Sequence, residues 1–228
     1  MIKDNLTKIR QQIAEAAAKA GRNPSEINLL AVSKRFDVLK IQEAFEQGQL
    51  LFGENYIQEA EKKINKLAPS ISWHFIGRLQ SNKALLAVQL FQIIETVDRL
   101  KIAKALNNHA RTIGKSQDIL VQVNIGREKQ KAGIDPDDAE GLLQELRNMK
   151  NLKIRGLMGM PPFSNDPEQT RPHFKALKKM ADHFTDKGYF AHSAPTILSM
   201  GMSNDFTIAI EEGSTLVRIG TSIFGKRT

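Results

Sequence analysis

The feature that most constrains the fold of this chain is a regular alternation between short apolar runs and longer segments with helical spacing. Eight apolar runs are found, at residues 29–33, 50–53, 73–77, 92–97, 119–124, 154–160, 196–200 and 216–220. Short strands that alternate with amphipathic helices are typical of parallel sheets with crossover helices. An open doubly wound sheet and a closed barrel both satisfy this order, but eight units in roughly 200 residues favour closure. We therefore predict an α/β protein, a single (β/α)8 TIM-type barrel.

The helical segments begin and end at residues that suit those positions. The first segment carries Ile2, Leu6, Ile9 and Ile13 at helical spacing before Gly21, which predicts an extra N-terminal helix. Three later segments follow an aspartate that is placed to cap a helix, namely Asp37, Asp98 and Asp135. No long linker rich in proline or glycine divides the chain, so we expect one domain over residues 1–228.

Composition and charge exclude several classes of function. The chain has no cysteine, which excludes a disulfide framework, a thiolate zinc site and a thiol nucleophile. Its start is charged and no long apolar stretch occurs, so we expect a cytoplasmic protein that does not enter a membrane. The net charge of +8 comes from scattered residues, and pairs such as Lys62-Lys63 are interpreted as solvated helix faces. Without a long basic block, nucleic-acid binding is not expected.

Lys34 directly follows the first apolar run and therefore stands at the carboxyl end of the first predicted strand. A barrel carries its chemistry at that end. Desolvation there favours the neutral amine, which is the nucleophilic form and which captures a carbonyl as a Schiff base. A lysine just past a strand is more often an ordinary solvated residue, so the position of Lys34 does not decide its role by itself.

Small and hydroxyl residues follow the last two predicted strands, where a barrel commonly grips phosphate. Ser203 and Asn204 come after the seventh run and are placed to cap the helix that follows. Gly220 and Thr221 end the eighth run. Such clusters are usually turns, but backbone amides and hydroxyls at a helix start also bind phosphate well. Their joint placement favours a phosphate site.

Three other polar residues allow more than one interpretation. Arg218 stands between apolar neighbours, so it either forms a structural ion pair or reaches a ligand at the strand end. Asn55 contacts a ligand or caps a helix, and His74 is more often a hydrogen-bonded core residue than a ligand. None of the five histidines has metal-ligand spacing with a second one, and no nucleophile elbow or Walker-type loop occurs. Metal catalysis and nucleotide hydrolysis are therefore unsupported.

Five segments resemble, in their residues, order and spacing, the signature motifs of the pyridoxal phosphate homeostasis protein family. They are AVSK at 31–34, FGENY at 52–56, WHFIG at 73–77, LSMGMS at 198–203 and VRIGT at 217–221. The resemblance extends over nearly the whole chain. It implies a barrel similar to the N-terminal domain of alanine racemase.

The resemblance also implies a cofactor, pyridoxal 5′-phosphate, held as a Schiff base on Lys34. In that arrangement Arg218 faces the ring nitrogen and Asn55 lies near the ring. The phosphate is held by Ser203, Gly220 and Thr221. Met200 packs beside the cofactor. Because arginine only donates hydrogen bonds, it favours an unprotonated ring nitrogen and a poorer electron sink, which disfavours transamination-type chemistry.

The family acts in vitamin B6 and amino-acid homeostasis, so the leading hypothesis is a protein that buffers or delivers pyridoxal 5′-phosphate. The implied partners are this cofactor and the apo forms of enzymes that use it, and we expect a monomer. The alternative is a weak amino-acid racemase. Racemisation needs acid or base groups on both faces of the substrate carbon. Because the given sequence ends at Thr228, we expect no second domain of the kind that supplies one such group in the related racemase.

Overall fold

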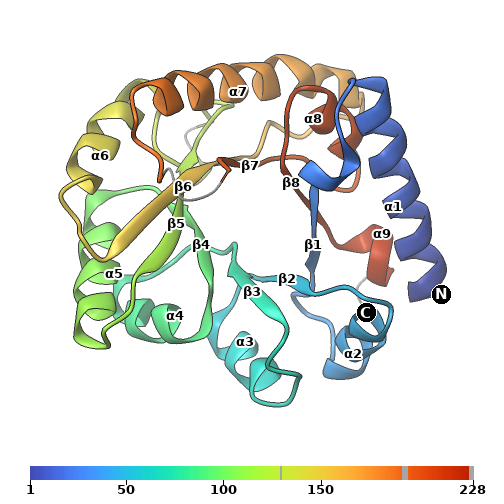
Figure 1. Ribbon diagram of the computed structural model, residues 1–228, viewed down its shortest axis with the longest axis horizontal. Coiled ribbons are helices and arrows are strands. Elements are labelled where there is room, and N and C mark those ends of the chain that lie inside the picture. The colour runs from blue at the N-terminus through green and yellow to red at the C-terminus, as the bar shows by residue number, and fades with distance from the viewer. Residues whose placement is uncertain (129, 192–194, 226–228) are drawn as a thin grey trace.

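The computed structural model describes residues 1–128, 130–191 and 195–225, and in it eight parallel strands close into a barrel. Each strand pairs with the next in chain order, and the last pairs with the first (Figure 1). The strands are β1 (Asn28–Val32), β2 (Leu51–Glu54), β3 (Ser72–Phe75), β4 (Ile93–Val97), β5 (Gln117–Val123), β6 (Leu152–Gly159), β7 (Ile197–Ser199) and β8 (Leu216–Ile219). The predicted fold class is confirmed.

The helices form a ring outside the strands (Figure 1). They are α1 (Ile2–Lys19), α2 (Val38–Glu46), α3 (Ile57–Ile64), α4 (Ala84–Leu90), α5 (Leu100–Thr112), α6 (Ala139–Leu146), α7 (Arg171–Asp186), α8 (Phe206–Glu211) and α9 (Thr221–Phe224). The extra helix α1 is confirmed: it buries Ile2, Leu6, Ile9 and Ile13 and packs beside α8 and α9. Within the described ranges, none of the helices combines the length and the apolarity needed to cross a membrane.

Two of the three predicted aspartate caps are confirmed. The Oδ1 atom of Asp37 accepts from the amide of Lys40 at 2.9 Å, and Asp135 caps the short 3-10 segment Pro136–Asp138 that precedes α6. The prediction for Asp98 was wrong. Helix α5 begins two residues later, after Arg99, and the Asp98 carboxylate pairs with the Arg99 guanidinium instead.

The side chains of each strand alternate between the outside and the inside of the barrel. The outward residues belong to the large apolar core beneath the helices, for example Trp73 and Phe75 of β3 and Val217 of β8. The inward residues form two smaller apolar clusters, with Leu30, Val32 and Leu216 in one and Ile93, Leu120 and Met158 in the other. Polar residues of the same inward register, such as His74 and Arg218, are therefore surrounded by strands on all sides.

A register irregularity in the β5–β6 pair depends on one glycine. The pairing of β5 with β6 shifts between Ile119 and Leu120. Opposite this shift, Gly156 has φ of +145°, and a Cβ atom built there would lie 2.0 Å from the carbonyl oxygen of Ile197. Both the left-handed φ and the close approach of β7 require glycine at this position.

Two glycine-to-alanine substitutions should therefore have opposite effects. Gly156→Ala should lower the free energy of unfolding by at least about 2 kcal/mol, because the strand must shift to relieve the clash. Gly141 lies inside α6, has ordinary helical backbone and has no atom within 4 Å of an added Cβ. Gly141→Ala should raise the free energy of unfolding by about 0.5–1 kcal/mol. Urea unfolding of both variants measures these changes, and equal effects would contradict the assigned strain.

Candidate functional site

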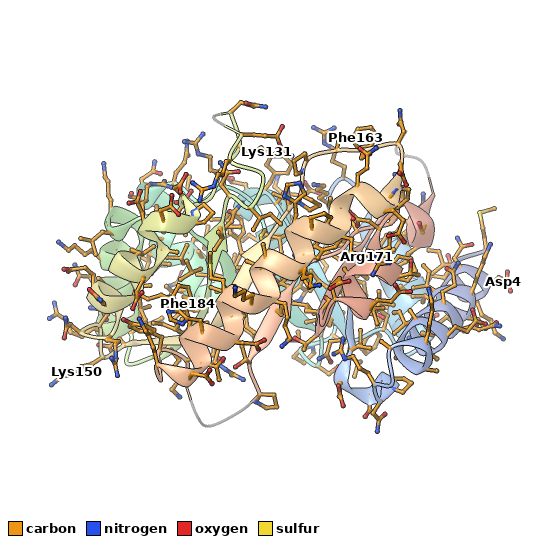
Figure 2. All side chains as sticks on the ribbon, turned by 90° about the horizontal axis from the view of Figure 1, so that it is seen from above. Asp4, Lys131, Lys150, Phe163, Arg171 and Phe184 are labelled. Atoms are coloured by element: carbon orange, nitrogen blue, oxygen red, sulfur yellow. The ribbon has the colours of Figure 1, made fainter. Side chains whose placement is uncertain are left out.

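A cavity of about 530 Å³ opens at the carboxyl ends of the strands. Figure 2 shows that Lys131 and Phe163, which both line it, lie at one edge of the molecule, whereas Lys150 lies towards the opposite edge. Six of the seven predicted cofactor residues line this cavity: Lys34, Asn55, Ser203, Arg218, Gly220 and Thr221. The seventh, Met200, is fully buried in the outer core and is not part of the lining, so its contact with a ligand stays a prediction.

The backbone on both sides of Lys34 is fixed by a second, buried lysine. Lys63 on α3 donates to the carbonyl oxygen of Ser33 at 2.9 Å and to Oε1 of Glu59 at 2.6 Å. The same Glu59 oxygen accepts from the amide of Arg35 at 2.5 Å. Arg35 has φ of +64°, an unfavourable region for a residue with a side chain, and its hydrogen bond helps to hold it there. The half-buried Lys34 thus extends from a rigid turn.

Glu54 at the end of β2 completes this buried cluster. Its Oε1 atom accepts from Lys63 at 2.7 Å and from the Ser33 hydroxyl at 2.7 Å. Burial raises the pKa of Glu54, although the charge and hydrogen bond of Lys63 and the hydrogen bond of Ser33 oppose that rise. The interpretation of Lys62-Lys63 as a solvated pair was therefore wrong for Lys63, which is only 5% exposed. Its (i, i+4) spacing from Glu59 looks like a surface helix pair, and only the contact with β2 shows otherwise.

A chain of hydrogen bonds through the barrel interior holds Arg218. Its Nη1 atom donates to the Ser199 hydroxyl at 2.6 Å, and its Nη2 atom donates to the carbonyl oxygen of Gly159 at 3.0 Å. Ser199 donates to Oε2 of Glu95 at 2.5 Å, and Oε1 of Glu95 lies 2.7 Å from Nδ1 of His74. Arg218 therefore has the buried acceptors expected for a structural role and also borders the cavity. His74 is a hydrogen-bonded core histidine, as predicted.

The charges in this interior chain compensate one another. Burial disfavours the ionised form of Glu95, but His74, Arg218 and Ser199 together outweigh it and hold the pKa of Glu95 below its ordinary value. Burial also lowers the pKa of Arg218, while Glu95 and Asp205 act in the opposite direction. An arginine remains protonated under such conditions because its ordinary pKa lies far above the neutral range. The cavity therefore has a permanent, immobile cation in its wall.

The loops after β7 and β8 meet in the lining beside the turn that carries Lys34. The hydroxyl oxygens of Ser203 and Thr221 lie 3.3 Å apart. A Cβ atom at Gly220 would lie 3.2 Å from the carbonyl oxygen of Val32, so a glycine keeps this approach open. The prediction that Ser203 and Asn204 cap the following helix was wrong. Asp205 is the N-cap residue of α8, and its carboxylate accepts from the amide of Met202 at 2.6 Å, which leaves the Ser203 hydroxyl at the cavity.

Asn55 has an acceptor atom that the protein does not satisfy. Its Oδ1 is buried and has no hydrogen-bond partner among the described residues. The capping alternative is excluded because Tyr56 is the N-cap residue of α3 and no side chain caps that helix. A buried acceptor without a donor is costly, so a hydrogen-bond donor from a bound ligand would complete this site.

Sequence reasoning missed the residues that position the site rather than line it. These residues are Lys63, Glu54, Glu95 and Ser199. No local sequence pattern assigns a hydrogen-bond partner to any of them. The only available signal was a charged residue in an apolar strand, as at Glu95 in the run 92–97.

The chain resembles known proteins over nearly its whole length. The model of the family described as alanine racemase, N-terminal domain, matches residues 5–228. The pyridoxal phosphate homeostasis protein of Escherichia coli K12 is 41% identical over 99% of this chain and 97% of its own length. That of Aquifex aeolicus is 38% identical over 98% of this chain and 97% of its own length. This chain belongs to the pyridoxal phosphate homeostasis protein family.

Solved structures similar to this chain have the same barrel. PipY of Synechococcus elongatus PCC7942 without pyridoxal phosphate (PLP) is 36% identical, with a TM-score of 0.87 over 99% of this chain and 100% of PipY. PipY with PLP bound is 35% identical, with a TM-score of 0.86 and the same coverage. An alanine racemase of Clostridium difficile 630 is 16% identical, with a TM-score of 0.75 over 98% of this chain and 57% of the racemase. That last likeness shows the fold alone.

Removing the buried cation of the Lys63 cluster should destabilise the protein. Lys63→Met leaves the Glu54 carboxylate buried without its counter-charge, which should lower the free energy of unfolding by about 3–5 kcal/mol. The double variant Lys63→Met/Glu54→Gln removes both charges and should lose less than the sum of the two single losses. Urea unfolding of the three variants measures the coupling. Additive losses would show that the pair does not interact as the structure indicates.

The stability that Glu95 provides should depend on pH. Because its folded pKa is lowered, the contribution of the ionised carboxylate is fully present above the ordinary value of about 4.3 and disappears as pH falls through the folded value. Glu95→Gln should lower the free energy of unfolding by about 3–5 kcal/mol at pH 7, and its difference from the wild type should shrink below about pH 4. The exposed residue Glu145 provides the control Glu145→Gln, with changes within about 0.5 kcal/mol at every pH. A difference for Glu95→Gln that stays constant with pH would contradict the assignment.

Proposed function

We propose that this protein binds pyridoxal 5′-phosphate in the cavity at the barrel mouth and acts in vitamin B6 homeostasis by holding and delivering it. The observation that carries the proposal is that an amine, a buried guanidinium and a pair of hydroxyls, on Lys34, Arg218, Ser203 and Thr221, line one cavity. The names of the relatives and the PipY structure with PLP bound support it.

The residues present fit the groups of this cofactor. The Nζ atom of Lys34 would condense with the aldehyde to a Schiff base, releasing one water, and hydrolysis reverses the step. The Ser203 and Thr221 hydroxyls and the backbone at Gly220 would hold the phosphate. The buried Oδ1 of Asn55 would accept a hydrogen bond from the ligand, which its protein surroundings do not supply.

Arg218 supports holding the cofactor rather than using it for demanding chemistry. The cofactor's own chemistry is to act as an electron sink, and its strength in that role depends on the partner of the ring nitrogen. Arg218 can only donate a hydrogen bond, and its contacts with Ser199 and Gly159 fix its orientation. Toward the ring, Arg218 would favour the unprotonated nitrogen. Such a site suits reversible capture and release.

We also propose delivery to apo enzymes that depend on the cofactor and a role in amino-acid homeostasis, both from the family resemblance. A cytoplasmic location is proposed from the composition of the chain, and a monomeric state is part of the same proposal. Weak racemase activity stays a prediction without separate support. Two described lining residues with acid or base groups are already bonded within the protein. The Asp205 carboxylate accepts from the backbone amide of Met202, and the Lys131 amine donates to the carbonyl oxygen of Pro161 at 3.0 Å.

Borohydride trapping followed by peptide mass mapping tests the proposal. The protein incubated with pyridoxal 5′-phosphate should show a visible absorption band that borohydride bleaches, with the reduced adduct on the peptide that contains Lys34. Lys34→Met should abolish the adduct. Lys179→Met, which removes an exposed lysine of α7, should leave it unchanged. An adduct mainly on Lys131, or no band at all, would overturn the assignment.

A further inference from the structure

A second cavity opens beside the one described above. It has a volume of about 490 Å³ and lies around the loop that follows β3, between the starts of α3 and α5. Asn55 lines both cavities, which makes them neighbours. The proposed binding of pyridoxal 5′-phosphate uses no other residue of this second cavity.

The lining of the second cavity is strongly basic. It contains Arg78, Lys83 and Arg99 and, as far as the described residues go, no carboxylate. The charge of Arg99 is already compensated, because its guanidinium pairs with Asp98 and donates to the carbonyl oxygen of Leu79 at 3.0 Å. The side chains of Arg78 and Lys83 form no hydrogen bond or ion pair with any residue in the described part of the chain.

The two side chains differ from the buried Lys63 and the half-buried Lys115, which donate to carbonyl or carboxylate oxygens. Arg78 is exposed and Lys83 is half-buried. Two like charges that share one cavity repel each other, and an anion between them removes that repulsion. The electrostatic requirement of the cavity is therefore a ligand with more than one negative charge.

Two helix starts add to the positive potential. Helix α3 begins after Tyr56, helix α5 begins after Arg99, and neither has a side-chain cap. Tyr56, Ile57 and Gln58, at the start of α3, line the cavity. Free amides at a helix start attract anions, because they are unsatisfied donors at the positive end of the helix dipole.

The size and the walls of the cavity indicate more than a bare ion. A water molecule occupies about 30 Å³ in the liquid, so a small inorganic anion would fill only a minor part of 490 Å³. Tyr56, which is 47% exposed, and the buried Leu79 give one side of the cavity an apolar surface. Gln58 and Gln80 add hydrogen-bonding groups.

We propose that this second cavity binds an organic phosphate monoester, with Arg78 and Lys83 contacting the phosphate and Tyr56 contacting the organic part. A phosphate monoester carries about −1.5 to −2 charges at pH 7, which matches two uncompensated cations better than a single carboxylate does. The site does not require the chemistry of Lys34. Both ligands would lie at the same mouth of the barrel, on either side of Asn55.

An amide-resolved NMR titration of the full chain tests this site separately from the first cavity. Phenyl phosphate should cause saturable shifts of the amides at 56–58, 78–83 and 99–100. Inorganic phosphate should shift the same amides with at least fivefold weaker affinity, because it cannot pack on Tyr56. Arg78→Gln/Lys83→Gln should weaken phenyl phosphate binding at least tenfold at these amides.

A charge-matched control separates a specific site from the general positive field. Lys150→Gln/Lys153→Gln removes two exposed lysines near the start of β6, at the other end of the barrel, and should change the affinity less than twofold. Equal weakening in both double variants would overturn the proposal, and so would shifts that do not saturate. Shifts confined to 201–204 and 220–221 would place the phosphate only in the first cavity and also overturn it. The same spectra show whether each variant is folded, and Arg78→Gln alone, with an expected loss of at least threefold, replaces the double variant if that one is not.

Discussion

The pairing of β8 with β1 is the constraint on which the rest of this structure depends. It places Leu30 opposite Arg218 and Ala31 opposite Ile219, and it closes the barrel. Closure brings Lys34, which follows β1, to the same cavity as Thr221, which follows β8, although most of the chain separates them. In an open sheet with the same strands, these two residues would not share a cavity. The candidate site is therefore a consequence of closure rather than of any one loop.

Two buried charge clusters hold two residues of the lining, Lys34 and Arg218, in place. Lys63, Glu54 and Glu59 hold the turn that carries Lys34, and Glu95 with Ser199 and His74 holds Arg218. Burying such charges is unfavourable, and the clusters persist because each charge is paired and hydrogen-bonded. The benefit is positional. In the proposed function, the amine of Lys34 and the guanidinium of Arg218 would act on a ligand whose place in the cavity is set before it arrives.

The strands could be predicted to within two residues of their ends, because their apolar runs are local and short. The caps at Asp37 and Asp135 were also predictable, since a cap bonds to amides two or three residues away. The predictions for Asp98 and Ser203 were wrong because a nearer competitor decides the outcome. Arg99 pairs with the Asp98 carboxylate, and Asp205 occupies the cap position after Ser203.

The sequence by itself determined the barrel, the strand ends that carry polar residues and the family to which the chain belongs, because periodicity and motif order are properties of the linear chain. Only the tertiary structure decided how each cation is used. Lys63 and Lys62 are adjacent in sequence, yet Lys63 is buried against Glu54 of β2, whereas Lys62 is not. Arg218 has buried partners, while Arg78 and Lys83 have none among the described residues. The burial and the ion pairing of a side chain depend on which strands and helices pack against it. Those contacts join residues that are far apart in the sequence, so no local pattern reveals them.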